Sequence, residues 1–134
     1  MRITRTADYG VRLMTELAAA QPGTRLTVAE LSQKSQSSLA FTAKILQRLV
    51  AARLAISHRG FEGGFELARP ADTISMLDIV AALDGNIALN ECEAEGLRCD
   101  RAPNCAARRV WMKAQEAMAQ VLGAESLAQM ASGS

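Results

Sequence analysis

The spacing of apolar residues along the chain predicts mainly helical structure. In residues 7–20, apolar side chains recur at helical spacing and form one stripe that we expect to be buried: Tyr9, Leu13, Met14, Leu17 and Ala18. Thr6 is the predicted N-cap of this helix, which places Asp8 in the first turn, where a carboxylate suits the positive end of the helix dipole. The Gln-Pro-Gly sequence that follows ends the helix.

Two further helical segments follow, separated by a short polar break. Thr27 and Glu30 predict a capping box at the start of the first segment, which we expect to run to about residue 34. Its inward residues are predicted to be Val28, Ala29 and Leu31. The second segment is predicted over residues 39–53, with Ala43, Leu46, Leu49 and Val50 inward. This pair predicts a helix-turn-helix, although its turn lacks the glycine that is often found there.

A β-hairpin is predicted directly after the second of these helices. Residues 54–57 and 65–68 alternate between apolar and polar, and they flank the glycine-rich stretch 58–64. A hairpin in this place is the wing of a winged helix-turn-helix. Arg59 beside Gly60 suits the wing tip, where a slim backbone lets a guanidinium enter the minor groove of DNA.

The C-terminal half predicts one short helix and one long one. The short helix starts at Ser75, ends at Asp84-Gly85, and carries an apolar stripe formed by Met76, Ile79, Val80 and Leu83. The long helix is predicted over residues 104–123, with a stripe wide enough to bury against a partner: Val110, Ala114, Ala117, Met118, Val121 and Leu122. We expect Trp111 to pack at the same dimer seam.

The predicted elements divide the chain into three parts. These are a DNA-binding domain (1–85), a cysteine-bearing loop (86–106), and a dimerisation helix with a C-terminal tail (107–134). The net charge of +1 conceals an asymmetry, because residues 1–70 carry +5 and residues 71–134 carry −4. A basic first half attached to an acidic second half is typical of a nucleic-acid-binding head with a regulatory half.

Composition narrows the class of protein further. Aromatic residues make up 4% of the 134 residues and hydrophobic residues 49%, which favours packed helices over a β-sandwich. No apolar run is long enough to span a bilayer and no signal peptide is evident, so we expect a cytoplasmic protein with reduced thiols. No catalytic triad, phosphate loop or nucleotide fingerprint is present, and we therefore expect no enzyme activity.

All three cysteines lie within fourteen residues, as Cys92-x6-Cys99-x5-Cys105. Thiolates are soft ligands that suit iron–sulfur clusters or zinc, and this spacing lacks the tight Cys-x-x-Cys pairs of structural zinc sites. Three is also an odd number, which argues against a closed disulfide framework. The alternative is three reduced cysteines without a ligand.

Four features of the sequence resemble the Rrf2 family of dimeric winged-helix regulators, which includes the IscR and NsrR types. They are the opening Arg-Ile-Thr-Arg-Thr-Ala-Asp-Tyr-Gly, the wing stretch 57–70, the Asp84-Gly85 pair, and the cysteines before Trp111. The resemblance covers about residues 1–131. It implies a homodimeric repressor whose 4Fe–4S or 2Fe–2S cluster, held by the three cysteines, senses iron–sulfur status, nitric oxide or redox stress. The alternative is a cluster-free member that senses by thiol oxidation or through a protein partner.

The resemblance also bears on the fourth cluster ligand. IscR-type proteins carry a histidine shortly after the last cysteine, whereas here Cys105 is followed by Ala-Ala-Arg-Arg and the only histidine is His58, in the wing. We expect His58 to lie near phosphate. NsrR-type members have an aspartate in the first helix that the opposite subunit supplies, and Asp8 matches that position. A first-turn carboxylate also stabilises its own helix without any ligand role.

For DNA, the predicted contacts come from the second helix and the wing. We expect base readout from the solvent-facing start of the helix, at Ser38, Ala40, Phe41 and Lys44. Arg48 and Lys34 are expected to contact phosphate, and Arg59 to contact DNA from the wing tip. The structural alternative places Phe41 in the core and leaves Lys44 in solvent. A homodimer implies a palindromic operator.

Overall fold

The computed structural model describes residues 2–85 and 106–133, so Cys92, Cys99 and Cys105 lie outside the described residues. Its elements are α1 (Arg5–Ala19), α2 (Val28–Ser35), α3 (Leu39–Ala51), β1 (Ala55–His58), β2 (Gly64–Leu67), the 3-10 turn η1 (Ala71–Thr73), α4 (Met76–Asp84), α5 (Ala106–Ala124) and α6 (Leu127–Ser132). This order confirms the mainly helical winged-helix prediction. None of the described helices is long and apolar enough to cross a membrane.

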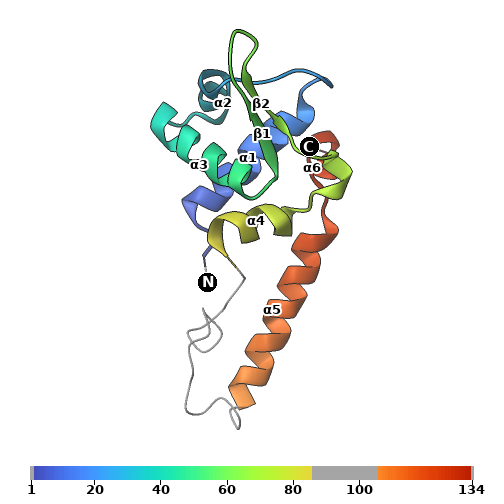
Figure 1. Ribbon diagram of the computed structural model, residues 1–134. Coiled ribbons are helices and arrows are strands. Elements are labelled where there is room, and N and C mark those ends of the chain that lie inside the picture. Colours follow the sequence, from blue (N-terminus) through green and yellow to red (C-terminus); the bar gives the residue numbers. More distant parts are fainter. Residues whose placement is uncertain (1, 86–105, 134) are drawn as a thin grey trace.

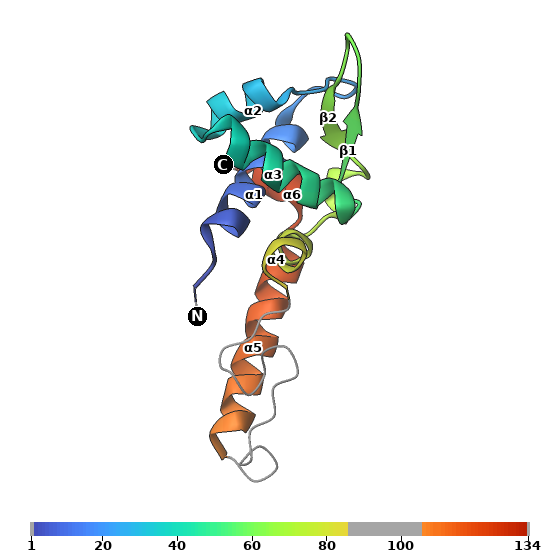
Figure 2. The same ribbon diagram turned by 60° about the vertical axis from the view of Figure 1, so that its left-hand side comes forward.

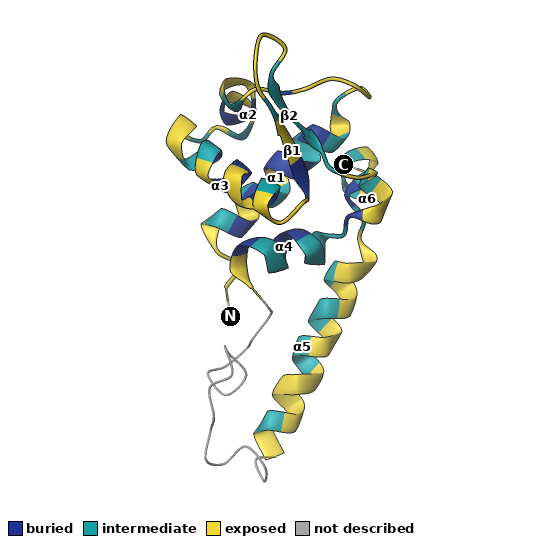
Figure 3. Cartoon of the chain, in the orientation of Figure 1, coloured by how far each residue is buried: buried dark blue, intermediate teal, exposed yellow. Residues whose placement is uncertain are grey.

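The described elements form a head, made of α1 to α4, the hairpin and α6, and an arm, which is α5 (Figure 1). α1 lies at the centre of the head, packed against α4 and α6 and also against α2, α3 and β2. The core is aliphatic, and its fully buried large side chains include Leu13, Met14, Leu31, Ile45, Leu46, Leu49, Ile74, Ile79 and Leu127. α5 extends away from this core as a single long helix, and its visible surface is largely exposed (Figure 3).

α1 begins earlier than its sequence predicts. Thr4, and not Thr6, is the N-cap, and its hydroxyl oxygen accepts a hydrogen bond from the Ala7 amide at 3.1 Å. The Thr4 hydroxyl and amide also donate to the Asp84 carboxylate at the end of α4. A contact eighty residues distant therefore helps to fix the start of the helix, which local sequence could not indicate. Asp8 lies in the first turn, as predicted.

The start of α2 confirms one half of the predicted capping box. The Thr27 hydroxyl accepts from the Glu30 amide at 3.1 Å, but the Glu30 carboxylate accepts from the Thr27 hydroxyl at 3.2 Å and not from the backbone. Ala29, predicted to face inward, is exposed. A helix of only eight residues buries one narrow side, and here that side is formed by Leu31 and Ser32.

The turn between α2 and α3 works without glycine. Gln36 caps α2 in the left-handed conformation, with φ 57° and ψ 45°, where glycine is usually favoured. Beyond it, the Ser37 hydroxyl lies 2.7 Å from the hydroxyl of the fully buried Thr42 and 2.9 Å from that of Ser35. This chain of hydroxyl groups satisfies Thr42 inside the head and fixes the angle at which α3 begins.

The wing is an antiparallel hairpin whose register runs from Ala55 opposite Leu67 to His58 opposite Gly64. Glycine is required near its tip, because a Cβ on Gly63 would lie 2.7 Å from the His58 carbonyl oxygen. An isolated bridge between Leu26 and Phe65 ties the hairpin to the loop before α2. Figure 2 shows the hairpin projecting from the head beside the C-terminal end of α3.

The chain returns to the head after the arm. Leu127 of α6 is fully buried in the head core, and its amide donates to the Ile74 carbonyl at 2.7 Å. The Met76 amide at the start of α4 donates to the Glu125 carbonyl at 2.9 Å. The predicted third part of the chain, residues 107–134, thus contains a helix that completes the core of the head.

The strained turn gives a test of the fold. We expect Gln36→Gly to raise the free energy of unfolding by about 0.5–1 kcal/mol, because glycine adopts the left-handed conformation without the cost that a Cβ imposes. Gln33→Gly, inside α2, is the matched control and should lower stability by about 1 kcal/mol. Urea denaturation measures both, and equal destabilisation by the two variants would contradict the left-handed turn.

Candidate nucleic-acid interface

The N-terminal part of α3 presents three of the four predicted base-reading residues to solvent. Ala40 and Lys44 are exposed on this helix, and Ser38 is exposed at its N-cap. The Ser38 hydroxyl oxygen accepts from the Phe41 amide at 3.1 Å, which leaves the hydroxyl hydrogen available to donate. These three residues therefore lie together on an accessible surface, as a DNA-reading helix requires.

Phe41 packs against the head. It is only half-buried, but its ring meets the Tyr9 ring edge-to-face, with 5.6 Å between the centroids. The Arg5 guanidinium lies 5.3 Å from the centroid of each ring, within the range of a cation–π contact. Phe41 therefore joins α3 to α1, which is the structural alternative that the sequence left open.

Arg48 and Lys34, the expected phosphate contacts, are both exposed but differ in their surroundings. One guanidinium nitrogen of Arg48 donates to the Leu83 carbonyl oxygen of α4. The Lys34 amine lies 4.0 Å from the Glu16 carboxylate, at the outer limit of an ion pair. Arg48 thus has a partner within the head, whereas Lys34 is held loosely and faces solvent.

The wing carries one residue that sequence reasoning identified and one that it missed. Arg59 is exposed at the tip, as expected. Phe61, two residues further, is fully exposed, although it is an aromatic residue of the tip. Its position inside a glycine-rich turn could have predicted this exposure, because a hairpin tip has no core in which a ring could be buried. The tip therefore presents a cation and an apolar ring that are separated by one glycine in sequence.

His58 is the last residue of β1, opposite Gly64, directly before the tip of the wing. Its Nε2 atom lies 3.4 Å from the Glu66 carboxylate, which also pairs with the Arg25 guanidinium at 3.3 Å. Arg25 in turn donates to the Glu62 carbonyl at 3.2 Å. This group of side chains holds the wing against the loop before α2, and His58 belongs to it.

Two further residues beside the reading helix were not singled out from sequence. Leu39 is 58% exposed at the first position of α3. Arg5 adds an exposed positive charge next to Phe41, and it lies in the family-like opening of the chain. The sequence offered a sign that each would be exposed. Leu39 directly follows the cap of its helix, and Arg5 precedes the apolar stripe of α1.

Asp8, the candidate fourth cluster ligand, is accessible. Its carboxylate is 52% exposed and lies 3.5 Å from the Arg12 guanidinium, an i,i+4 pair on the solvent side of α1. It also borders a hollow between the start of α1 and α4, together with Val11, Met76 and Val80. The other three candidate ligands are the cysteines outside the described residues. Within 2–85 and 106–133, no three His, Cys, Asp or Glu side chains gather as a metal site.

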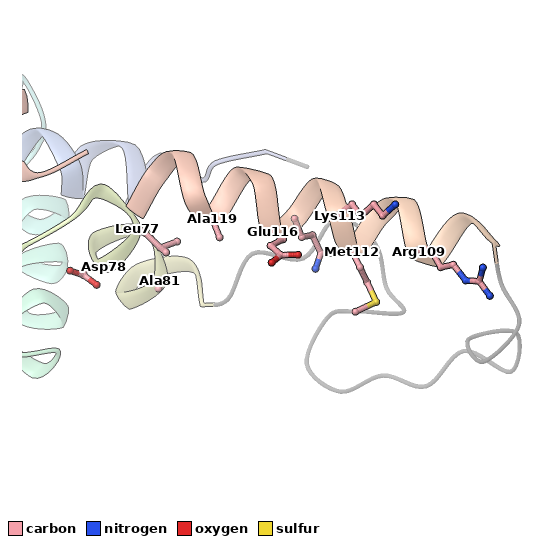
Figure 4. Close-up of a pocket in the computed structure, with 9 residues that line it drawn as sticks. Leu77, Asp78, Ala81, Arg109, Met112, Lys113, Glu116 and Ala119 are labelled. Atoms are coloured by element: carbon pink, nitrogen blue, oxygen red, sulfur yellow. The ribbon is translucent and has the colours of Figure 1, made fainter. Parts of the chain in front are cut away.

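α5 leaves its apolar side uncovered. None of its residues is buried, and Val110, Trp111, Met112 and Val121 are between 43% and 66% exposed. A groove runs between α5 and α4, and Figure 4 shows Leu77 and Ala81 on one wall and Met112, Glu116 and Ala119 on the other. These apolar side chains lie open to solvent along the described part of α5.

Known proteins share both the sequence and the shape of this chain. A Mycobacterium tuberculosis protein described as an HTH-type transcriptional regulator, Rv1287, is 37% identical over 133 residues, covering 99% of this chain and 83% of its own. The IscR regulator of Vibrio vulnificus is 28% identical over 111 residues, covering 83% of this chain and 66% of its own.

Among solved structures, CymR, described as the global cysteine regulator of B. subtilis, superposes with a TM-score of 0.85. It is 28% identical, and the match covers 100% of this chain and 98% of that one. Staphylococcus aureus CymR in its oxidized form matches with a TM-score of 0.78 and 26% identity, covering 98% and 97%. These relatives regulate transcription, which confirms that the chain is not an enzyme. A family model described as an iron-dependent transcriptional regulator matches residues 3–133, and the chain therefore belongs to the Rrf2 family.

Proposed function

We propose that the chain is a homodimeric repressor whose affinity for a palindromic operator is controlled by an iron–sulfur cluster. The observation that carries this proposal is the placement of all three cysteines in residues 86–105, between the last helix before the arm and the arm itself. A group bound there would act on the head through α4 and on the partner subunit through α5. That is the position in which a bound group can change how two heads are held.

The donor set fits a cluster by its chemistry. Cys92, Cys99 and Cys105 would supply three thiolates, the ligands that iron–sulfur clusters take, and Asp8 of the partner subunit would supply an oxygen. When bound, the cluster supplies a group that responds to iron supply, nitric oxide and oxidants. Carboxylate oxygen is a harder donor than thiolate, so we propose that the Asp8 bond is the first to be lost.

Asp8 would give the proposed sensor a direct route to the DNA-binding head. It lies on α1, which packs against α2, α3 and α4, and its carboxylate faces outward. A ligand bond from Asp8 would join the cluster of one subunit to the head of the other. Loss of that bond would release the whole head from the partner's cluster and would let the spacing of the two heads change, and half-site spacing decides whether both heads fit one operator.

For DNA contact, we propose that α3 enters the major groove and the wing tip approaches the adjacent minor groove. Ser38, Ala40 and Lys44 would meet base edges or phosphate, and Arg59 would enter the narrow groove. The exposed Phe61 ring would lie against sugars or bases at the same place. Phe41, whose half-buried ring packs on Tyr9, would offer only its exposed part to the DNA.

We further propose that a second copy of the chain covers the exposed side of α5. Val110, Ala114, Ala117 and Val121 follow one another at spacings of four, three and four residues, so they lie in one row along the helix. This row is apolar throughout. α5 itself extends away from the head (Figure 1). Two such helices packed side by side would bury both rows and hold two heads in one particle.

The alternative function is a cluster-free regulator that senses by thiol oxidation or through a protein partner. Its support is the likeness to CymR, one structure of which is described as a global cysteine regulator and another as an oxidized form. The same three cysteines would then be the reactive groups. The two functions differ in whether the sensing form of the protein contains iron.

Anaerobic purification separates the two functions. We expect coloured protein that contains iron and sulfide, and a change of about 5- to 150-fold in affinity for a selected palindromic duplex when the cluster is removed, as is typical of coupled sites. The triple Cys92→Ser, Cys99→Ser, Cys105→Ser variant should bind as the iron-free protein does. Fluorescence anisotropy measures the affinities, with absorption and iron analysis beside it. Colourless, iron-free parent protein whose binding still responds reversibly to a thiol oxidant would establish the alternative.

Asp8→Ala tests the fourth ligand. We expect the variant to assemble a cluster with an altered visible spectrum and a shorter lifetime in air, because one ligand position is left to water or a buffer molecule. Asp72→Ala, which removes an exposed carboxylate from η1, is the matched control and should leave spectrum and lifetime unchanged. An Asp8→Ala cluster indistinguishable from that of the parent would restrict Asp8 to its helix-stabilising role.

Val121→Lys tests the proposed dimer interface along α5. Val121 is 66% exposed, so the change should leave the head folded while placing two charges in a desolvated interface. We expect the dimer to dissociate at least tenfold more readily, measured by analytical ultracentrifugation. Gln120→Lys adds the same charge at an exposed neighbouring position outside the row and should have little effect. A Val121→Lys variant as dimeric as the parent would mean that another surface holds the subunits together.

A further inference from the structure

The last turn of α4 is contacted by both α3 and the start of α1. The Arg48 side chain, from the C-terminal half of α3, reaches across and places Nη2 2.5 Å from the Leu83 carbonyl oxygen. Thr4, at the start of α1, donates from both its amide and its hydroxyl to the neighbouring Asp84 carboxylate. Two consecutive residues of α4 thus bind two different helices.

The Arg48 contact gives a hydrogen-bond donor to the C-terminal end of α4. The last carbonyl groups of a helix lack intrahelical partners and carry the negative end of the dipole, so they favour a cation. The last turn of α4 contains no basic residue, and its terminal residue, Asp84, is acidic. Arg48 therefore provides from another helix the positive charge and donor that a C-terminal turn commonly obtains from its own Lys or Arg.

Close packing holds α4 where Arg48 can reach it. Leu83 is 4% exposed, and a Cβ built on Gly10 of α1 would lie only 2.1 Å from its Cδ1 atom. Any side chain at residue 10 would force Leu83 to move. Leu83 thus packs with its side chain against Gly10 of α1, while its carbonyl oxygen accepts from Arg48 of α3.

We infer that Arg48 is a positioning residue, which fastens the reading helix α3 to the last turn of α4 and acts on DNA affinity through the orientation of α3. This inference rests on the proposed DNA-binding function of α3, and it replaces the sequence-based expectation that Arg48 contacts phosphate. The chain leaves α4 at Gly85, directly before residues 86–105. Arg48 therefore links α3 to the residues that enter the cysteine-bearing segment.

The salt dependence of binding distinguishes positioning from phosphate contact. Each phosphate contact contributes about 0.9 to the slope of log K against log salt concentration, so loss of one contact per subunit should lower the slope of a dimer by about 1.8. A positioning residue changes affinity without changing that slope. Lys44 is the comparison, because it lies four residues before Arg48 on the same helix and is also exposed.

The experiment measures dissociation constants for a selected palindromic duplex at several KCl concentrations, well below the melting temperature of each variant. We expect Arg48→Met to bind about tenfold more weakly with an unchanged slope, because methionine keeps the length but loses the donor. Arg48→Lys, which keeps a donor and the charge, should recover part of the loss. Lys44→Met should lower the slope by about 1.8.

Three results would overturn the inference. The first is an Arg48→Met slope that falls as far as that of Lys44→Met, which would make Arg48 a phosphate contact. The second is an unchanged affinity with a lower melting temperature, which would limit Arg48 to stability. The third is an Arg48→Lys variant as weak as Arg48→Met, which would exclude the hydrogen bond as the cause. Failure of the parent protein to bind any duplex would instead contradict the proposed function itself.

Discussion

The close packing of α1 against α4 is the contact on which the rest of the structure depends. Gly10 permits it, because only a residue without a side chain lets Leu83 approach so closely. The same two helices are joined again where Thr4 meets Asp84. With α4 held in this way, the opposite surfaces of α1 remain available for α2, α3 and β2. The position of α3 therefore depends on α1 and α4 as well as on α2, its partner in the helix-turn-helix.

Much of this architecture could be predicted because it follows from local rules. The apolar stripe of α1, the Ser75 cap of α4 and the glycine-rich wing each depend on residues close together in sequence, and the structure confirms all three. The failures have distant causes. Thr4 replaces Thr6 as the cap while its side chain also binds Asp84, and Leu127 is buried because α6 returns to the head. Neither contact can be predicted from residues that are close together in sequence.

The candidate interface shows the same division. Exposure of Ala40, Lys44 and Arg59 follows from their places on a helix surface and a hairpin tip, which the sequence already indicates. The surroundings of Phe41 and Arg48 do not, because Tyr9 and Leu83 lie 32 and 35 residues away in the chain. From sequence alone, an aromatic and an arginine on the second helix of a helix-turn-helix suggest DNA contact, whereas their contacts with Tyr9 and Leu83 are visible only in the tertiary structure.

α4 is bound at both of its ends, and this gives the arm a mechanical connection to the reading helix. At its start, the Met76 amide donates to the Glu125 carbonyl just beyond the end of α5, and Ser75 bridges to Ser126. At its other end, the Leu83 carbonyl accepts from Arg48 of α3. Along its nine residues, α4 also packs directly against both α5 and α3. Because α4 contacts both the arm and α3, a tilt of α5 would reach α3 through the contacts at the two ends of α4.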